Sequence, residues 1–287
     1  MKTKMVVFAI TLMLLTSAVH AFQVDGGLSD WGVTPGTDWV PNAGIDSWEE
    51  DSVDYSNSGY VGPGYGGQPW DVELLMASVD DGKLYLAVVA GTPPDGSYSM
   101  WQDGVLETRG NYYYPGDIGL DLNGDGVFEI GLETTGYSDN ILGGDPALPG
   151  GDGHTYDPSL QGNIYAISDA GGWNVGYSSM GSPVTEIDYS DPSKLTLLGN
   201  TMLVYIQDTD PDHYVMETYI DLGLLDLDDV DEILFHFSVT CGNDIGEVLI
   251  PGDSIDLLPG GPTVPEPATI FLLSMGIAGT RAMRRNK

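Results

Sequence analysis

Basic residues are scarce in this chain of 287 residues, which has 9 lysines and arginines against 43 aspartates and glutamates. Six of the nine lie near the two ends, so residues 22–263 keep only three: Lys83, Arg109 and Lys194. The same stretch holds 42 acidic residues, which gives it a formal charge of 3 − 42 = −39. Binding of phosphate needs lysine and arginine, so nucleic acid, nucleotide cofactors and anionic lipid are not expected partners.

Cysteine is almost absent, since Cys241 is the only one. The chain therefore forms no intramolecular disulfide, and its stability must come from packing or from bound metal. Cys241 also lacks a plausible base, because His236 lies five residues away and a strand would place it on the opposite face. With no zinc-ligand spacing among the histidines and no Gly-x-Ser-x-Gly motif, we expect a protein that is not an enzyme.

The first 21 residues have the pattern of a secretory signal peptide. Lys2 and Lys4 precede an apolar stretch at 5–15, and the small residues Val19 and Ala21 occupy the positions where such peptides are cut. We expect export through the Sec translocon and cleavage after Ala21.

The last 24 residues, 264–287, have three parts in order. They are the tripeptide Pro265-Glu266-Pro267, an apolar segment at 268–280, and a basic end with Arg281, Arg284 and Arg285. The apolar segment is shorter than the roughly 20 residues of a stable transmembrane helix. The basic end is expected to stay cytoplasmic, with the rest of the chain outside.

This arrangement resembles the PEP-CTERM sorting signal of Gram-negative bacteria, which an exosortase processes. The resemblance implies transient anchoring in the inner membrane through a short apolar helix at 268–280. It also implies delivery to the cell surface or the extracellular matrix. A simple C-terminal membrane anchor is the alternative interpretation.

Between these ends, the pattern predicts an all-β body at 22–250, followed by a spacer at 251–263. Short apolar runs alternate with Gly, Pro, Asp and Asn, as in a β-sandwich or jelly roll. The Asp-Gly turn at 80–83 predicts a hairpin. Other expected strands are 117–122, 127–132, 162–167, 173–177, 201–206, 213–220 and 233–239. Residues 222–231 are the best candidate for a short helix, while 41–68 and 136–158 look like long loops.

Two shorter resemblances concern the body. Asp25-Gly26-Gly27-Leu28-Ser29-Asp30-Trp31 is similar to the first strand of DOMON domains and family-nine carbohydrate-binding modules. That resemblance implies a sandwich that binds sugar or haem, and haem is disfavoured because no His–Met pair stands out. The segment 235–244 resembles the last strand of PEP-CTERM surface proteins, where a cysteine and a Gly-Asn-Asp turn recur.

Residues 121–129 form the sharpest local motif. Oxygen-bearing side chains at Asp121, Asn123 and Asp125 precede a glycine, as in the first half of a calcium loop, and the Val127 carbonyl and Glu129 carboxylate offer further ligands. The EF-hand pattern is incomplete, because its twelfth position is Leu132. An ordinary Asn/Asp/Gly turn is the competing interpretation. The acidic stretch 208–212 is a weaker candidate.

The sequence therefore predicts an exported, exosortase-processed surface or matrix protein without enzymatic activity. Calcium is a candidate ligand, and exopolysaccharide is another, since aromatic rings stack on sugars. The aromatic candidates are Trp31, Trp39, Trp48, Trp70, Trp101 and Tyr112–Tyr114, although Trp31 is expected in the core. Two alternatives remain open, a secreted glycan hydrolase or lyase and a purely structural matrix spacer.

Overall fold

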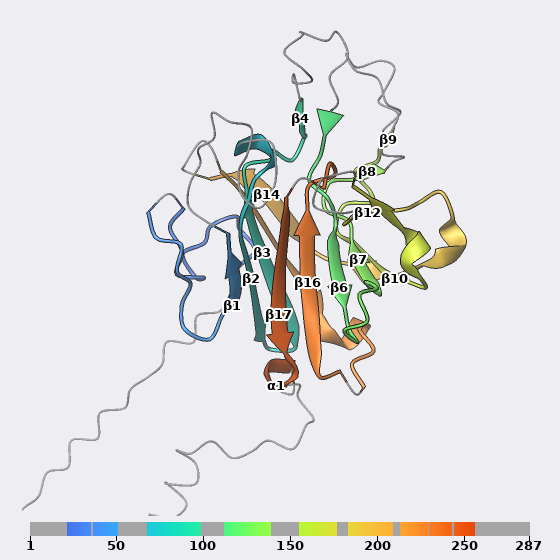
Figure 1. The fold of residues 1–287 in the computed structure, drawn as a ribbon. Coiled ribbons are helices and arrows are strands. Elements are labelled where there is room, and N and C mark those ends of the chain that lie inside the picture. The colour runs from blue at the N-terminus through green and yellow to red at the C-terminus, as the bar shows by residue number, and fades with distance from the viewer. Residues whose placement is uncertain are drawn as a thin grey trace, which may run out of the picture.

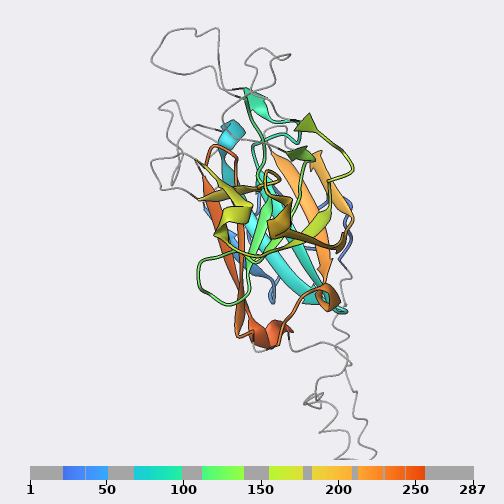
Figure 2. The ribbon, with the colours of Figure 1, turned by 90° about the vertical axis from the view of Figure 1, so that its right-hand side faces the viewer.

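The body of the chain is a β-sandwich, as predicted from the sequence (Figure 1). The computed structural model describes residues 22–35, 37–50, 68–98, 112–138, 155–176, 183–208, 213–228, 230–242 and 244–255. Two antiparallel sheets face each other and hold most of the buried side chains between them (Figures 1 and 2).

The first sheet has five strands in the order β1-β2-β3-β15-β14. Their bounds are β1 (Asp46–Glu49), β2 (Val72–Asp80), β3 (Lys83–Ala90), β14 (Leu203–Gln207) and β15 (Tyr214–Asp221). The β2–β3 hairpin is confirmed, with Asp80 opposite Lys83. Asp81 and Gly82 both have positive φ angles, 46° and 75°, which is the requirement of the two-residue turn that suits twisted strands.

The second sheet has six strands in the order β13-β10-β7-β6-β16-β17. Their bounds are β6 (Ile118–Asp121), β7 (Ile130–Leu132), β10 (Asn163–Ile167), β13 (Leu195–Asn200), β16 (Glu232–Ser238) and β17 (Ile245–Pro251). The predicted hairpin between β6 and β7 is confirmed, with Leu120 opposite Ile130. Its connection, 122–129, is the calcium candidate.

Smaller elements decorate the sandwich. Three short pairs are β4 (Ser97–Tyr98) with β5 (Tyr112–Tyr113), β8 (Tyr137–Ser138) with β9 (Thr155–Tyr156), and β11 (Trp173–Val175) with β12 (Val184–Ile187). The helical turns are η1 (Gln68–Trp70), η2 (Ala170–Gly172), η3 (Pro192–Lys194), η4 (Leu222–Leu224) and α1 (Gly252–Ile255). Within the described ranges, no helix is long and apolar enough to span a membrane.

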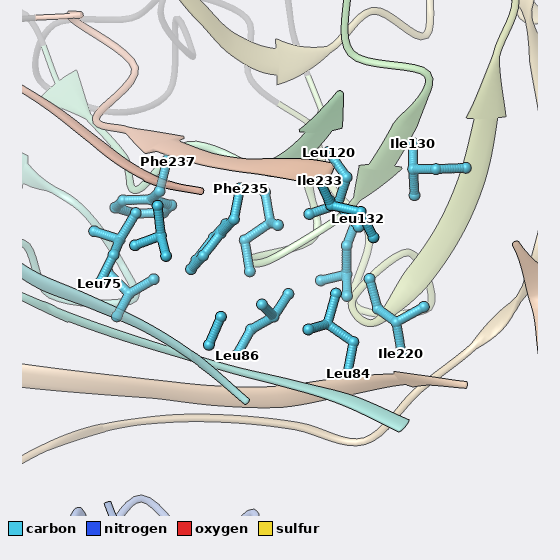
Figure 3. Close-up of a cluster of buried hydrophobic side chains, with 14 of the residues drawn as sticks. Leu75, Leu84, Leu86, Leu120, Ile130, Leu132, Ile220, Ile233, Phe235 and Phe237 are labelled. Atoms are coloured by element: carbon cyan, nitrogen blue, oxygen red, sulfur yellow. The ribbon is translucent and has the colours of Figure 1, made fainter. Parts of the chain in front are cut away.

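The main core lies between the two sheets. Leu84 and Leu86 of the five-stranded sheet face Phe235 and Phe237 of the six-stranded sheet, and all four side chains are fully buried (Figure 3). These residues alternate along their strands, so one side of each strand points inward. Each such side chain contributes roughly 1.5–3 kcal/mol through the hydrophobic effect.

A second apolar cluster lies on the outer face of the five-stranded sheet, where the segment 22–45 covers it. Trp31 is 1 % exposed, and its indole Nε1 donates a hydrogen bond of 2.7 Å to Glu217 on β15. The backbone N–H groups of Asp25 and Gly26 donate to the same carboxylate. Gly26 has a φ of 83°, and a Cβ there would collide with Ile206. The Asp-Gly-x-Leu-x-x-Trp-like motif thus fixes this segment to the sheet, and Trp31 is a core residue as expected.

Three expectations about local structure were wrong. The helix predicted at 222–231 is only the single turn η4, because Leu225 already has an extended backbone, with φ −98° and ψ 145°. Both stretches interpreted as loops contain strands: 41–68 contains β1, which pairs with β2, and 136–158 contains β8 and β9, which pair with each other. Residues 251–255, expected as the start of a spacer, belong to the fold. Pro251 ends β17, and α1 places Ile255 in the main core at 4 % exposure.

The transport segments predicted at 1–21 and 264–287 lie outside the described residues, as does the expected helix at 268–280. The structure therefore does not test signal cleavage after Ala21 or the roles of Pro265, Glu266 and Pro267, which stay predictions from the sequence. The same holds for the basic residues Arg281, Arg284 and Arg285.

Candidate metal centre

The turn between β6 and β7 is organised around one buried carboxylate. Asp121, 1 % exposed, is the last residue of β6. Its Oδ1 accepts hydrogen bonds from the N–H groups of Asn123 (3.1 Å) and Gly124 (2.7 Å), and its Oδ2 accepts one from Gly126 (2.9 Å). The two glycines have φ angles of 72° and 83°, a conformation that suits residues without a Cβ. The chain therefore curls around the Asp121 side chain.

The other polar residues of this turn extend the network. Asn123 Oδ1 accepts from the Asp125 N–H at 2.9 Å, and Asp125 Oδ1 accepts from the Val127 N–H at 2.8 Å. Glu129 reaches back across the turn, where its Oε1 accepts from Asn123 Nδ2 at 2.6 Å and its Oε2 from the Leu122 N–H at 2.9 Å. The side chains of the motif are thus held by their own backbone.

Three carboxylates converge in this turn, and we name Asp121, Asp125 and Glu129 the turn cluster. One oxygen from each lies within 4.8 Å of an oxygen of the other two. Each carboxylate oxygen has two lone pairs, so those that already accept an N–H keep capacity for an ion. Of the other two predicted ligands, Asn123 bonds Glu129 with its amide, and Val127 follows in the same turn.

No described lysine neutralises the turn cluster. Lys83 lies 4.2 Å above the ring of Tyr219, and Lys194 forms an ion pair with Asp169 at 3.2 Å. The weaker candidate at 208–212 lies mostly outside the described residues. Within it, Asp208 donates its backbone N–H to the His213 carbonyl.

A second acidic group was not predicted, and we name Glu50, Asp71 and Asp244 the sheet-end cluster. These residues follow β1, precede β2 and precede β17, and their carboxylates lie within 4.8 Å of one another. Asp244 accepts from the Val72 N–H at 2.6 Å, and burial raises its pKa. The three residues are far apart in sequence, so no spacing rule could have joined them. Only the Gly-Asn-Asp turn had singled out Asp244.

A third acidic pair is fully buried beside the six-stranded sheet. Asp117 accepts from the N–H groups of Thr134 and Ile187, both at 2.9 Å. Glu133 accepts from the Gly136 N–H and from the Tyr189 hydroxyl, both at 2.8 Å. Burial, together with the charge of Glu133, raises the pKa of Asp117 well above its usual range, and burial also raises the pKa of Glu133. Both shifts favour the protonated, neutral form of these carboxyls.

The described tryptophans offer little surface to a sugar, and of the predicted tyrosines Tyr114 is buried and Tyr113 is half-buried. Trp31 and Trp39 are buried, while Trp48 and Trp70 are half-buried against the main core. Trp101 lies outside the described residues. Cys241 is buried and forms no disulfide, as expected. Both ring nitrogens of His236 are engaged, one by Glu247 at 3.1 Å and the other by the Val184 carbonyl at 3.0 Å.

Comparison with known proteins identifies one part of this chain. Residues 263–286 match the model of the PEP-CTERM protein-sorting motif, as expected from the tripartite tail. This motif marks an exported surface protein that an exosortase sorts and processes. No curated protein and no solved structure matches the chain. The predicted resemblance of the body to DOMON domains and family-nine modules is not confirmed.

Proposed function

We propose that this exported, PEP-CTERM-sorted protein is a calcium-binding surface or matrix component without enzymatic activity. It reaches the surface of a Gram-negative bacterium through the Sec translocon and exosortase, with transient anchoring in the inner membrane through 268–280. The observation that carries the calcium proposal is the convergence of Asp121, Asp125 and Glu129 in one turn.

The distances in the turn cluster suit a calcium ion. Calcium takes six to eight oxygen ligands at about 2.3–2.6 Å, so two ligands of one ion lie at most about 5 Å apart. The three carboxylates fall within this limit, since their oxygens lie within 4.8 Å of one another. The Asn123 amide oxygen, the Val127 carbonyl and water are available to complete the shell. Three uncompensated negative charges favour a divalent cation over a monovalent one.

The acidic surface supports a role in a hydrated matrix. Calcium bound to exposed carboxylates can bridge the −39 body to acidic exopolysaccharide, which the protein alone would repel. A glycosidase needs two carboxyl groups that contact the substrate. The closely paired carboxyls Asp117 and Glu133 are 3 % and 0 % exposed, so a glycan cannot reach them. This pair therefore cannot serve as the two carboxyl groups of a glycosidase.

Calcium titration followed by thermal unfolding tests the proposal. We expect calcium to raise the Tm of the protein, with a gain of about 2.7 kcal/mol when the ion is at a hundredfold excess over its Kd. Asp125→Asn removes one ligand charge but keeps an oxygen that can accept the Val127 N–H. It should abolish most of the calcium-dependent gain.

Asp191→Asn is the matched control, because Asp191 is also exposed and also accepts an N–H from the residue two positions later, Ser193. Its calcium response should equal that of the unmodified protein. Magnesium at equal ionic strength should give a smaller gain, since it demands a tighter octahedral shell. An unchanged Tm at millimolar calcium would refute the calcium proposal and favour the structural spacer. If the Asp125→Asn protein were no longer retained in the extracellular matrix of the cells, the calcium proposal would extend to binding of exopolysaccharide.

A further inference from the structure

The turn between β6 and β7 contains the one Asn-Gly pair of this sequence, Asn123-Gly124, and both residues are exposed. Asparagine is chemically labile, because its side-chain amide can react with the backbone nitrogen of the next residue. Closing that bond gives a five-membered ring. A glycine in the next position leaves the nitrogen open to the amide, since it has no Cβ. The other described asparagines, Asn42, Asn163, Asn174 and Asn200, precede residues that carry a Cβ.

The surroundings of Gly124 suit this reaction. Its φ angle is 72°, and beyond its chain neighbours a Cβ placed there would have nothing nearer than Glu232 Oε1, at 3.9 Å. The Gly124 N–H donates to Asp121 Oδ1 at 2.7 Å, so a proton acceptor already contacts the nitrogen that would attack. A positioned side chain that takes up a proton is a general means of accelerating such steps. The nitrogen can therefore pass its proton to a residue of the same turn.

The amide of Asn123 is held in the same network. Its Oδ1 accepts the Asp125 N–H at 2.9 Å, and its Nδ2 donates to Glu129 Oε1 at 2.6 Å. When a nucleophile attacks the amide carbon, negative charge develops on Oδ1. A backbone N–H aimed at that oxygen stabilises such an intermediate. The stretch 121–125 thus supplies a nucleophile, a proton acceptor and a donor to the developing oxyanion.

We propose that Asn123 is a self-modification site, at which attack by the Gly124 backbone nitrogen converts the asparagine to aspartate or isoaspartate. The nitrogen forms a bond to Asn123 Cγ, and its proton passes to Asp121 Oδ1. The carbonyl electron pair moves to Oδ1 and returns as the Cγ–Nδ2 bond breaks, and Nδ2 leaves with the proton as ammonia. Water then opens the cyclic imide at either of its two carbonyls. The reaction consumes one water and releases one ammonia, and it needs no oxidant or reductant.

The reaction changes the turn cluster itself. Opening at one carbonyl leaves an aspartate, so a new carboxylate replaces the amide that donates to Glu129 and faces that carboxylate instead. Opening at the other carbonyl gives isoaspartate, which inserts the Cβ of residue 123 into the backbone. The longer backbone displaces the N–H groups of Gly124 and Gly126 from Asp121. Both products loosen the turn, and the reaction does not depend on calcium binding.

Incubation of the full chain at neutral pH in EDTA, followed by peptide mapping and an ammonia assay, tests the proposal. Mass spectrometry with fragmentation should locate a hydroxyl in place of the amide at Asn123, and isoaspartate at the same position. The same chain in urea keeps the Asn-Gly pair but loses the proton acceptor and the oxyanion donor. Asn123 should therefore react at least about tenfold faster in the folded protein than in urea.

Two glutamine variants assign the ammonia to its source. Asn123→Gln places the carbonyl one carbon farther from the Gly124 nitrogen, so it should remove most of the ammonia release. Asn200→Gln is the matched control, because Asn200 is also exposed and its amide also donates hydrogen bonds, to Gln161 and Asn163. Its ammonia release should equal that of the unmodified protein.

Three results would overturn the proposal. The first is a rate in urea that equals or exceeds the folded rate, since the fold would then give no assistance. The second is ammonia release that persists in Asn123→Gln, and the third is a product that maps to other asparagines and not to position 123. EDTA removes calcium from this experiment, so its failure leaves the calcium proposal untouched, and an unchanged Tm in calcium leaves this proposal untouched.

Discussion

The turn cluster and the buried pair Asp117–Glu133 both bring carboxylates together, yet they lie in opposite environments. Asp125 of the turn cluster is exposed, and the backbone of a single turn holds all three acids. Asp117 and Glu133 are 3 % and 0 % exposed, and they accept hydrogen bonds from two segments of the fold, 134–136 and 187–189. In water, carboxylates keep their charge and attract a cation. Without water, they retain a proton and bond to the backbone.

The contrast also separates function from structure among the 42 acids of the body. Acids held by the backbone of a single turn can bind an ion, and we expect their loss to leave the sandwich intact. Buried acids such as Asp117 and Asp244 fix strand ends that come from distant parts of the sequence. The acidic residues of the body therefore fall into two groups, those held within one turn and those buried between distant segments. Substitutions in the two groups should differ in how much they lower the free energy of unfolding.

The largest effect is expected for Glu133→Ala in the buried pair. The substitution leaves the N–H of Gly136 and the hydroxyl of Tyr189 without an acceptor and opens space beside Asp117. Each buried polar group without a partner costs about 1–3 kcal/mol, so the free energy of unfolding should fall by at least about 3 kcal/mol. Denaturant unfolding at neutral pH measures this loss.

Glu129→Ala in the turn cluster is the matched comparison, because Glu129 also accepts two hydrogen bonds. Its site is only half-buried, so water can replace the carboxylate, and the loss should stay near about 1 kcal/mol. Equal losses for the two alanine variants would break the distinction between the two groups.

The same distinction explains what the sequence could predict. The turns at 80–83 and 121–129 were recognised because their Asp, Asn and Gly residues act on neighbours only a few positions away. β13 and the sheet-end cluster were missed, because pairing and burial join residues such as Asp71 and Asp244 only after folding. The helix expected at 222–231 failed for a related reason. Leu222 and Leu225 both pack into the main core, and the backbone becomes extended at Leu225.

An intermediate effect is expected for the pH dependence that Glu217 contributes. Burial raises the pKa of Glu217 from its ordinary value of 4.5 to about 7, opposed by its bonds from Trp31, Gly26 and Asp25 and supported by the charge of Asp30. In the unfolded chain this carboxyl ionises near 4.5, whereas the folded protein holds the proton to about pH 7. Its contribution is therefore complete below pH 4.5 and is lost as the pH rises through 7.

Glu217→Gln should remove this part of the pH dependence. Since one pKa unit corresponds to about 1.4 kcal/mol, the free energy of unfolding of the unmodified protein should fall by up to about 3 kcal/mol from this group between pH 4.5 and 8. Asp117, Glu133 and Asp244 have raised pKa values too, so they change stability with pH in the same direction. Their contribution to the pH dependence should remain in the Glu217→Gln variant. Urea unfolding at several pH values gives the slope. If Asp125→Asn reduced the slope of unfolding free energy against pH by the same amount, the slope would come from surface charge and not from Glu217.

The smallest effect is expected for Asp125→Asn in calcium-free buffer, and its sign is the informative part. The change keeps an oxygen for the Val127 N–H but removes repulsion with Asp121 and Glu129, whose oxygens lie within 4.8 Å. Unfolding free energy should rise by about 0.5 kcal/mol at low salt, and less as salt screens the charges. Asp191→Asn should show no gain, because Asp191 lies beside Lys194 and has no comparable repulsion to lose. With calcium added, Asp125→Asn should become the less stable protein, since the ion turns the repulsion into binding. A variant that is destabilised equally with and without calcium would show that the turn cluster serves the fold, as the buried pair does.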